Sequence, residues 1–157
     1  MKLYHSSNVV VRQPDTYHSR KFLDFGCGFY LTSIYDQAVR YAQRFKRRGQ
    51  QAWLNTYEFT LDNETQWKII RFEAYDAQWL DFVAQCRDGK EVGDYDMVIG
   101  GIANDRVILT LDRYFANEIS QGEALGLLRF EKPNIQYCIR SERMLQACLT
   151  YVESEQL

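Results

Sequence analysis

Hydrophobic positions along the chain recur with two different periods, and this predicts a mixture of strands and helices. Short runs rich in β-branched and aromatic residues predict strands. The predicted strands are residues 2–5 with a continuation at 9–11, then 28–32, 52–61, 67–72, 96–102, 135–139 and 147–152. Apolar residues spaced three or four positions apart predict helices. The predicted helices are residues 34–48, 75–86, 104–115, 121–130 and 142–146.

The first predicted helix has clear signals at both ends. Ser33 is the expected amino-terminal cap, because its hydroxyl oxygen can accept a hydrogen bond from a free backbone N–H. Cations and then Gly49 end the helix, which suits the helix dipole and a left-handed stop. The side expected to face the core carries Ile34, Ala38, Tyr41, Ala42 and Phe45.

The order of the elements predicts the fold class. Residues 52–61 and 67–72 are expected to pair as a hairpin around the polar turn at 62–64. Strands and helices are otherwise intermixed without a regular strand–helix–strand repeat, which favours an α+β fold over a doubly wound one. A chain of 157 residues is long enough for one sizeable core, so we expect a single domain over residues 1–157.

Composition and charge narrow the class of protein. Hydrophobic residues make up 46% and charged residues 25%, which is typical of a globular domain and not of a disordered chain. The sequence has neither a long apolar run nor a signal peptide, so we expect a soluble cytoplasmic protein with no membrane partner. Four cysteines without paired spacing indicate reduced thiols and no metal site. The net charge of −2 gives no overall attraction to nucleic acid.

Two short stretches combine small residues with side chains that bind ligands. His5 is followed by Ser6 and Ser7, whose small size allows a ligand to approach the backbone closely. Gly28 ends a glycine bend shortly before Tyr30. Taken alone, each stretch is better explained as a tight turn beside a structural side chain.

Taken together, the two stretches and the helix after them resemble the ADP-ribosyltransferase superfamily. Leu3–Ser7 (LYHSS) and Phe25–Thr32 (FGCGFYLT) are followed by Ala38 and Tyr41 on the next helix. The His-Tyr-Glu branch, with the poly(ADP-ribose) polymerases and diphtheria toxin, has a strand with His-Gly-Ser, then Gly-x-Gly-Ile-Tyr-Phe, then a helix with a small residue and a second tyrosine. The resemblance implies a split β-sandwich, in which two small sheets enclose an NAD cleft and are flanked by helices.

A bacterial domain family of the same superfamily is similar over most of the chain. Its members resemble residues 24–32, 95–105 and 136–145. Its relatives are frequently encoded beside a small protein that resembles an antitoxin, which implies a toxin with an antitoxin as its partner. Asn104 and Asp105 lie in the second stretch, where Asn104 is also well placed to cap a helix.

The resemblance implies roles for five residues around an NAD molecule. His5 would donate a hydrogen bond to the ribose on the adenosine side, and the backbone of Ser6 would bind the nicotinamide carboxamide. Tyr30 and Tyr41 would hold the nicotinamide ring between them by stacking and cation–π attraction. Ala38 would fill the small position between the two tyrosines.

Other residues near the cleft have two interpretations each. Gly28 either forms the bend at the NAD site or only a tight turn. Tyr41 has core spacing and is alternatively buried in the core. Arg12 and Arg20 lie in the loop between the two motifs, where a guanidinium would pair with the NAD pyrophosphate or face solvent.

At the third motif position the chain departs from the family. The family has a glutamate there that contacts a ribose hydroxyl and stabilises the transition state. The matching residue here is Gln136, which carries no charge and cannot act as a general base. Glu131, Glu142 and Asp24 are candidates for a replacement carboxylate, and Asp24 is the best placed because it lies beside the glycine bend.

The resemblance therefore implies an NAD-dependent mono-ADP-ribosyltransferase with a His-Tyr-Gln motif, in which His5, Tyr30 and Gln136 are catalytic. Its acceptor is a protein or a nucleic acid that the sequence does not identify. The basic run at 44–48 is a solvated helix end or a contact for nucleic acid. Two alternatives stay open: a non-catalytic module that binds NAD or another nucleotide, and an NAD glycohydrolase that uses water as the acceptor.

Overall fold

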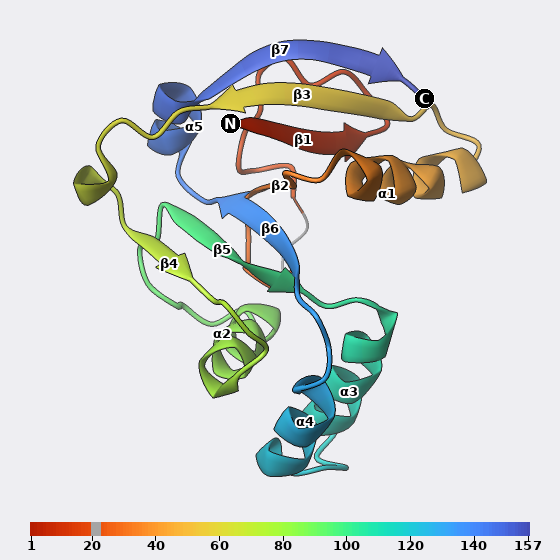
Figure 1. The fold of residues 1–157 in the computed structure, drawn as a ribbon, viewed down its shortest axis with the longest axis vertical. Helices are drawn as coiled ribbons and strands as arrows, with labels where there is room; N and C mark the ends of the chain where they lie inside the picture. Colours follow the sequence, from red (N-terminus) through yellow and green to blue (C-terminus); the bar gives the residue numbers. More distant parts are fainter. Residues whose placement is uncertain (20–22) are drawn as a thin grey trace.

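Two small sheets lie one above the other in the computed structural model, which describes residues 1–19 and 23–157 (Figure 1). Sheet A is antiparallel, with the strand order β1-β3-β7. Sheet B has the order β2-β6-β5-β4, in which β4 and β5 are parallel and the other pairs antiparallel. The strands of sheet A are β1 (Lys2–Ser7), β3 (Trp53–Phe59) and β7 (Leu149–Gln156). The strands of sheet B are β2 (Phe29–Leu31), β6 (Asn134–Ile139), β5 (Met97–Ile102) and β4 (Ile69–Arg71).

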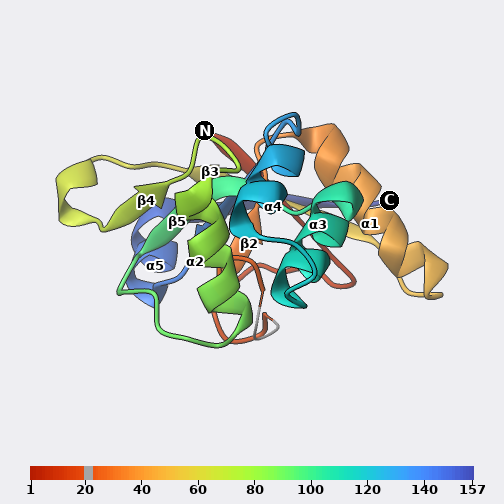
Figure 2. The same cartoon turned by 90° about the horizontal axis from the view of Figure 1, so that it is seen from below.

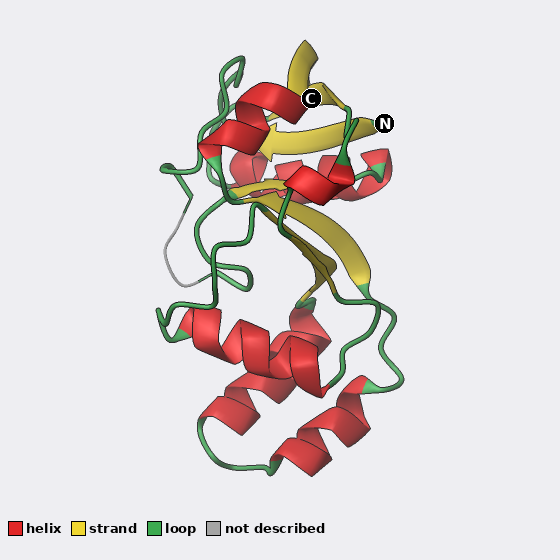
Figure 3. Ribbon diagram, turned by 90° about the vertical axis from the view of Figure 1, so that its left-hand side faces the viewer, coloured by secondary structure: helices red, strands yellow, loops and turns green. Residues whose placement is uncertain are grey.

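Five α-helices, counted over the described residues, accompany the sheets, so the prediction of an α+β fold is confirmed. Three of them cover the side of sheet B that faces away from sheet A (Figure 3). They are α2 (Ala77–Arg87), α3 (Asp105–Phe115) and α4 (Gln121–Leu128). The view in Figure 2 shows these helices beside one another, with α1 (Tyr35–Arg47) to one side.

The remaining helices connect the two sheets. α1 follows β2 and packs along β1 and β3 of sheet A. α5 (Glu142–Cys148) leads from β6 into β7, and the 3-10 helix η1 (Glu64–Gln66) lies between β3 and β4. Each helix in the described part of the chain is too short or too polar to span a membrane.

Two apolar cores hold these layers together. One core lies between the sheets and joins Leu3 and Tyr57 of sheet A to Leu31 and Ile139 of sheet B. The other lies between sheet B and the helices α2–α4 and includes Cys138. Neighbouring residues of a strand point to opposite faces, so Cys138 faces the helices and Ile139 faces sheet A. Sheet B is therefore buried on both faces.

The predicted hairpin of residues 52–61 and 67–72 is wrong, because β3 and β4 lie in different sheets. β3 is the central strand of sheet A, so β1 and β7 already occupy both of its edges. β4 pairs with β5 instead, with Ile69 in the core between the sheets and Ile70 against the other core. A strand that is apolar on both faces is stabilised within a sheet covered on both sides.

The expected cap at Ser33 is also wrong. α1 begins at Tyr35, and Ile34 is its cap residue without a capping side chain. The hydroxyl of Thr32 accepts a hydrogen bond from the Ile34 N–H at 3.1 Å. The helix start is thus held by the last residue of the glycine-rich motif.

The buried face of α1 is narrower than predicted. Ala38 and Ala42 are buried, whereas Ile34 and Tyr41 are each 48% exposed. Alanines let a helix approach a strand closely, so the larger neighbours remain on the outer side of α1. Tyr41 therefore lies at the surface.

Candidate functional site

The two sheets are joined by a bridge and then separate. The Tyr4 N–H donates to Thr32 O at 2.8 Å, and the Thr32 N–H donates to Tyr4 O at 3.0 Å. Beyond this bridge β1 continues in sheet A and β2 in sheet B. Antiparallel register places Ser6 opposite Tyr30 across the gap. We call the gap between Ser6 and Tyr30 the β1–β2 split.

Ser6 presents an unused pair of backbone groups to the split. Successive residues of a strand direct their N–H and C=O to alternate edges. Because Tyr4 pairs with Thr32, Ser6 also directs its N–H and C=O away from β3. Neither group has a hydrogen-bond partner within the described residues. Ser6 is only 8% exposed, and a buried, unpaired donor and acceptor are uncommon, which makes this pair a candidate for ligand binding.

The serine fits this position without strain, although the resembling family has glycine there. Over the described residues, a positive φ outside glycine occurs at Asn117 and not at Ser6. The Ser6 hydroxyl donates a hydrogen bond to Ala38 O at 2.5 Å. The side chain therefore binds α1 and leaves the backbone pair free.

His5 reaches across the split from β1 to β2. Its Nδ1 lies 2.8 Å from Tyr30 O, and since a carbonyl only accepts, Nδ1 carries the proton. The imidazole packs on Phe29, with ring centroids 4.3 Å apart. Burial lowers the pKa of His5 below 6.5 and outweighs the opposing effect of the hydrogen bond to Tyr30 O. At neutral pH the ring is therefore neutral, and Nε2 is a hydrogen-bond acceptor.

Stability at acidic pH tests this state of His5. Unfolded His5 binds a proton at about pH 6.5, whereas folded His5 binds it only at lower pH. The unfolded state thus binds more protons below about pH 6.5, and the free energy of unfolding is expected to fall there as the pH falls. In urea unfolding, His5→Gln should lose this part of the slope. His18→Gln is the comparison for the loss of an imidazole, because the His18 side chain is 90% exposed and its partner is Asp15 and not the split. A slope that survives His5→Gln unchanged would contradict a neutral His5 in the folded chain.

Tyr30 is fixed to the glycine bend by both functions of its hydroxyl. The hydroxyl donates to Gly26 O at 2.6 Å and accepts from the Phe25 N–H at 3.1 Å. The rings of Tyr30 and Phe25 are nearly parallel, with centroids 6.4 Å apart. Burial is the main cause that raises the pKa of Tyr30, so the phenol stays neutral. Tyr30 is therefore a rigid surface and not an acid or a base.

Gly28 lets β2 approach β6 closely. A Cβ at this position would lie 2.5 Å from Cys138 Sγ and 2.8 Å from Ile139 O. The Gly28 N–H donates to Ser19 Oγ at 3.0 Å. The structure thus gives Gly28 a packing role between strands, and its contact with NAD stays a prediction.

α1 supplies one buried and one exposed residue of the predicted set. Ala38 is buried, and its carbonyl accepts the hydrogen bond from Ser6. Tyr41 is 48% exposed, so the alternative that it is a core residue is wrong. The Arg44 guanidinium lies 4.5 Å from the centroid of the Tyr41 ring. A nicotinamide ring held between Tyr30 and Tyr41 stays a prediction.

Gln136 lies on the same face of sheet B as Tyr30. Tyr30 is paired with Cys138 of β6, and Gln136 is two residues before Cys138. Gly100 of β5 lies opposite Gln136 on the other side. The Gln136 side chain is half-buried and has no hydrogen-bond partner within residues 1–19 and 23–157. Its amide is therefore available to bind a ligand.

Asp24 is not a free carboxylate. It accepts from Arg87 Nε at 2.8 Å and from the Ala103 N–H at 3.0 Å, and its side chain is 13% exposed. These bonds join the glycine bend to α2 and to the end of β5. Asp24 therefore has a structural role, which argues against it as the replacement for the missing glutamate.

The two other candidate carboxylates are also engaged. Glu142 accepts hydrogen bonds from the backbone and the hydroxyl of Thr16, at 2.7 and 2.9 Å. Glu131 lies 3.5 Å from the guanidinium of Arg106. A carboxylate held by such partners is not positioned to replace the glutamate that the resembling family has at the position of Gln136.

Asn55, to which no motif pointed, organises the side of the split that belongs to sheet A. It is fully buried and lies opposite His5 in the β1–β3 register. Its Oδ1 accepts from the Val11 N–H at 2.9 Å and from the Ser154 hydroxyl at 2.7 Å. Its Nδ2 donates to His5 O and Val9 O, each at 3.3 Å. The signal in the sequence was a lone amide within an apolar strand.

The predicted strand at residues 9–11 is wrong, because the Asn55 side chain takes up backbone groups of these residues. These residues fold back over sheet A, and their backbone bonds to side chains and not to a neighbouring strand. The Tyr57 hydroxyl adds a second anchor by donating to Val11 O at 2.6 Å. The loop after β1 is thus fixed beside His5.

The described residues that remain from the predicted set have contacts of their own. Asn104 caps α3, because its side chain accepts from the Val107 N–H at 2.9 Å, and Asp105 lies in the first turn. The Arg12 guanidinium lies 5.4 Å from the centroid of the Tyr151 ring. Arg20 is outside the described residues, so its contact with a pyrophosphate stays a prediction.

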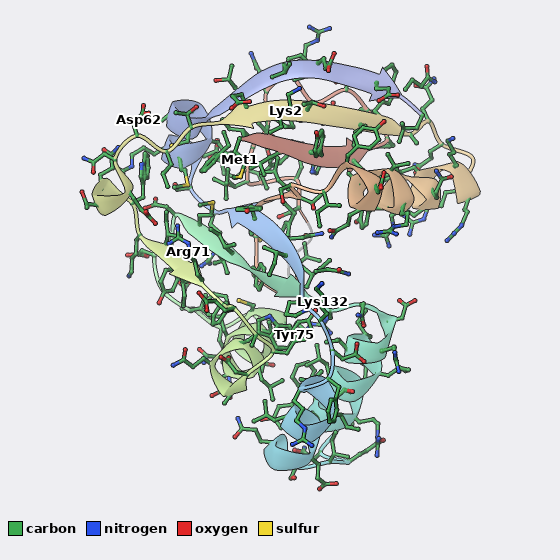
Figure 4. The ribbon with its side chains drawn as sticks, in the orientation of Figure 1. Met1, Lys2, Asp62, Arg71, Tyr75 and Lys132 are labelled. Carbon is green, nitrogen blue, oxygen red and sulfur yellow. The ribbon has the colours of Figure 1, made fainter. Side chains whose placement is uncertain are left out.

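A hollow of about 560 Å³ lies elsewhere in the molecule, between α4 and the start of α2. Tyr75, which is labelled in Figure 4, forms part of its wall. Its other walls include Leu125 and Arg129. None of its lining residues belongs to β1 or β2, so it is separate from the split.

Comparison with known proteins finds no curated protein and no solved structure that matches this chain. A protein-family model matches residues 1–151, and its description is "Protein of unknown function (DUF3990)". The match includes both strands of the split, α1 and Gln136. It covers nearly the whole chain, and the chain therefore belongs to the DUF3990 family.

Proposed function

We propose that this chain binds NAD in the β1–β2 split and transfers one ADP-ribose to an acceptor. Its two stacked sheets would then form an ADP-ribosyltransferase-like split sandwich. The observation that carries the proposal is the unused backbone pair of Ser6. A primary carboxamide has an oxygen that accepts and an NH2 that donates, so the nicotinamide carboxamide matches an N–H and a C=O side by side.

The state of His5 suits a sugar hydroxyl on the same ligand. With its Nδ1–H donated to Tyr30 O, the neutral ring offers Nε2 as an acceptor. A ribose hydroxyl would therefore donate to His5, the reverse of the direction expected from the resemblance. Tyr30 would supply aromatic surface for the nicotinamide ring.

NAD supplies the bond that reacts, between the nicotinamide nitrogen and the anomeric carbon of ribose. Nicotinamide leaves with the electron pair of that bond, and the acceptor bonds to the anomeric carbon and loses a proton. Ser6 would hold the leaving group, and Gln136 would orient the ribose hydroxyl through its amide. Because Gln136 is uncharged, it stabilises positive charge on the ribose less than a carboxylate would, and slow transfer is expected.

A second candidate function is an NAD-binding module without chemistry. The observation that favours it is the shortage of free carboxylates around the split. Gln136 is neutral, and Asp24, Glu131 and Glu142 all have partners. The toxin role and the antitoxin partner stay predictions from the resemblance.

Ser6→Pro tests the backbone contact, because proline removes the N–H without changing a ladder bond. The N–H of Ser6 points to the edge of β1 that faces the split and has no ladder partner there, so its removal breaks no strand pairing. We expect Ser6→Pro to weaken NAD binding by at least about tenfold, which corresponds to losing one hydrogen bond to a buried group. Ser6→Ala is the matched control, since it loses the hydroxyl but keeps the N–H. Calorimetric titration with NAD, with thermal melts of each variant, measures the effect. Equal NAD affinity for the two variants would show that the Ser6 N–H does not bind NAD.

Labelled NAD separates the candidate activities. Incubation with the purified chain and a cell extract should yield free nicotinamide together with a labelled macromolecule. Free nicotinamide without a labelled macromolecule would instead indicate an NAD glycohydrolase. Clear binding without turnover would favour the module, and no binding would overturn the proposed site.

A further inference from the structure

α1 carries a concentration of positive charge that the rest of the molecule lacks. Residues 35–48 contain five cations and one acid, a net charge of +4, whereas the whole chain carries −2. The other residues together therefore carry −6. Such a segregated charge creates a local positive field on a protein that is acidic overall.

The cations are arranged as a stripe on one side of α1. Residues four and then three or four positions apart share one side of a helix, about 6 Å apart along its axis. Arg40, Arg44, Arg47 and Arg48 follow this spacing, and Tyr41 lies beside them. Figure 4 shows nitrogen-tipped side chains projecting from α1 away from sheet A. We call these five residues the α1 stripe.

None of the cations in the stripe has an acidic partner. Within the described residues, no carboxylate lies within 4 Å of any of them, although eight ion pairs occur elsewhere. Like charges four positions apart on a helix destabilise it by a few tenths of a kcal/mol per pair. The stripe contains two such pairs, so a bound polyanion would relieve a repulsion that the folded chain leaves uncompensated.

The aromatic residue in the stripe indicates the kind of polyanion. Tyr41 is 48% exposed, and Arg44 lies 4.5 Å from its ring centroid. Guanidinium groups bind phosphates bidentately, and an exposed aromatic ring stacks on an unpaired base. Single-stranded nucleic acid uses both the charges and this ring.

We propose that the α1 stripe binds single-stranded nucleic acid. The phosphates lie along Arg40, Arg47 and Arg48, and a base stacks on Tyr41. Tyr41 belongs to the same helix as Ala38, whose carbonyl is bonded to Ser6 at the split. If the proposed transferase function holds, on which this last step rests, nucleic acid is the acceptor class.

Fluorescence anisotropy with a short labelled single-stranded RNA, and with DNA of the same sequence, tests the binding without NAD. The triple variant Arg40→Gln, Arg47→Gln, Arg48→Gln removes three cations from the stripe. The control Lys2→Gln, Lys90→Gln, Lys132→Gln removes three exposed cations elsewhere. At about 50 mM salt we expect at least about tenfold weaker binding for the stripe variant, and a salt slope smaller by about 2. The control should stay within about twofold of the parent chain.

Tyr41→Leu separates stacking from charge. It should weaken binding by about five- to tenfold at every salt concentration, because base stacking does not depend on counterions. No binding by the parent chain, an equal loss in both triple variants, or tighter binding to phosphatidylserine vesicles than to RNA would each overturn the proposal. Nucleic-acid binding without NAD binding would support this inference and contradict the proposed function. NAD binding without nucleic-acid binding would support the proposed function and contradict this inference.

Discussion

Gln136→Glu is expected to raise the rate of NAD cleavage by about two to three orders of magnitude. Gln136 shares a face of sheet B with Tyr30, and its side chain has no partner among the described residues. A carboxylate has nearly the same size, so the variant should keep the fold. It adds a negative charge where positive charge develops on the ribose, and such a charge acts strongly in a half-buried place.

The measurement is the release of nicotinamide from NAD as a function of pH. The rate of Gln136→Glu should rise with pH as the new carboxylate ionises, whereas the parent chain has no such group at this position. Gln146→Glu is the matched control, because Gln146 is exposed on α5 and the change in net charge is the same. Equal rates for the two variants would mean that position 136 does not face the reacting ribose.

Local periodicity predicted most elements because it depends only on neighbouring residues. The helices α2, α3 and α5 begin within two residues of their predicted starts. The partition of strands between sheets was not predictable in the same way. It depends on which strand edges are free, and β3 has none because it is central in sheet A. β4 therefore pairs with a strand almost thirty residues away in the sequence.

The candidate site shows the same division between local and non-local information. Motif order pointed to His5, Ser6 and Tyr30, and the structure places all three at one gap. The unused N–H and C=O of Ser6 follow only from the bridge between Tyr4 and Thr32, which no local pattern reveals. The exposure of Tyr41 depends on how closely α1 approaches β1, so its spacing alone indicated a core residue.

Asn55→Ala is expected to lower the free energy of unfolding by about 3 kcal/mol or more. The loss removes one hydrogen bond from each of four partly buried groups: His5 O, Val9 O, the Val11 N–H and the Ser154 hydroxyl, which keeps its bond to the Tyr151 hydroxyl. An unpaired buried polar group costs about 1–3 kcal/mol, and the cavity in a fully buried strand adds to this. Urea unfolding measures the change, with Asn63→Ala in the exposed turn before η1 as the control.

The same substitution connects stability with the split. Asn55 fixes the loop of residues 9–11 beside His5, and Tyr57 is the second anchor of that loop. Hydrogen exchange at the Val11 amide should therefore accelerate in Asn55→Ala by more than global unfolding explains. A loss of stability below about 1 kcal/mol would show that solvent replaces the amide. Unchanged exchange at Val11 would show that the hydrogen bond from Tyr57 is enough to keep the loop closed without Asn55.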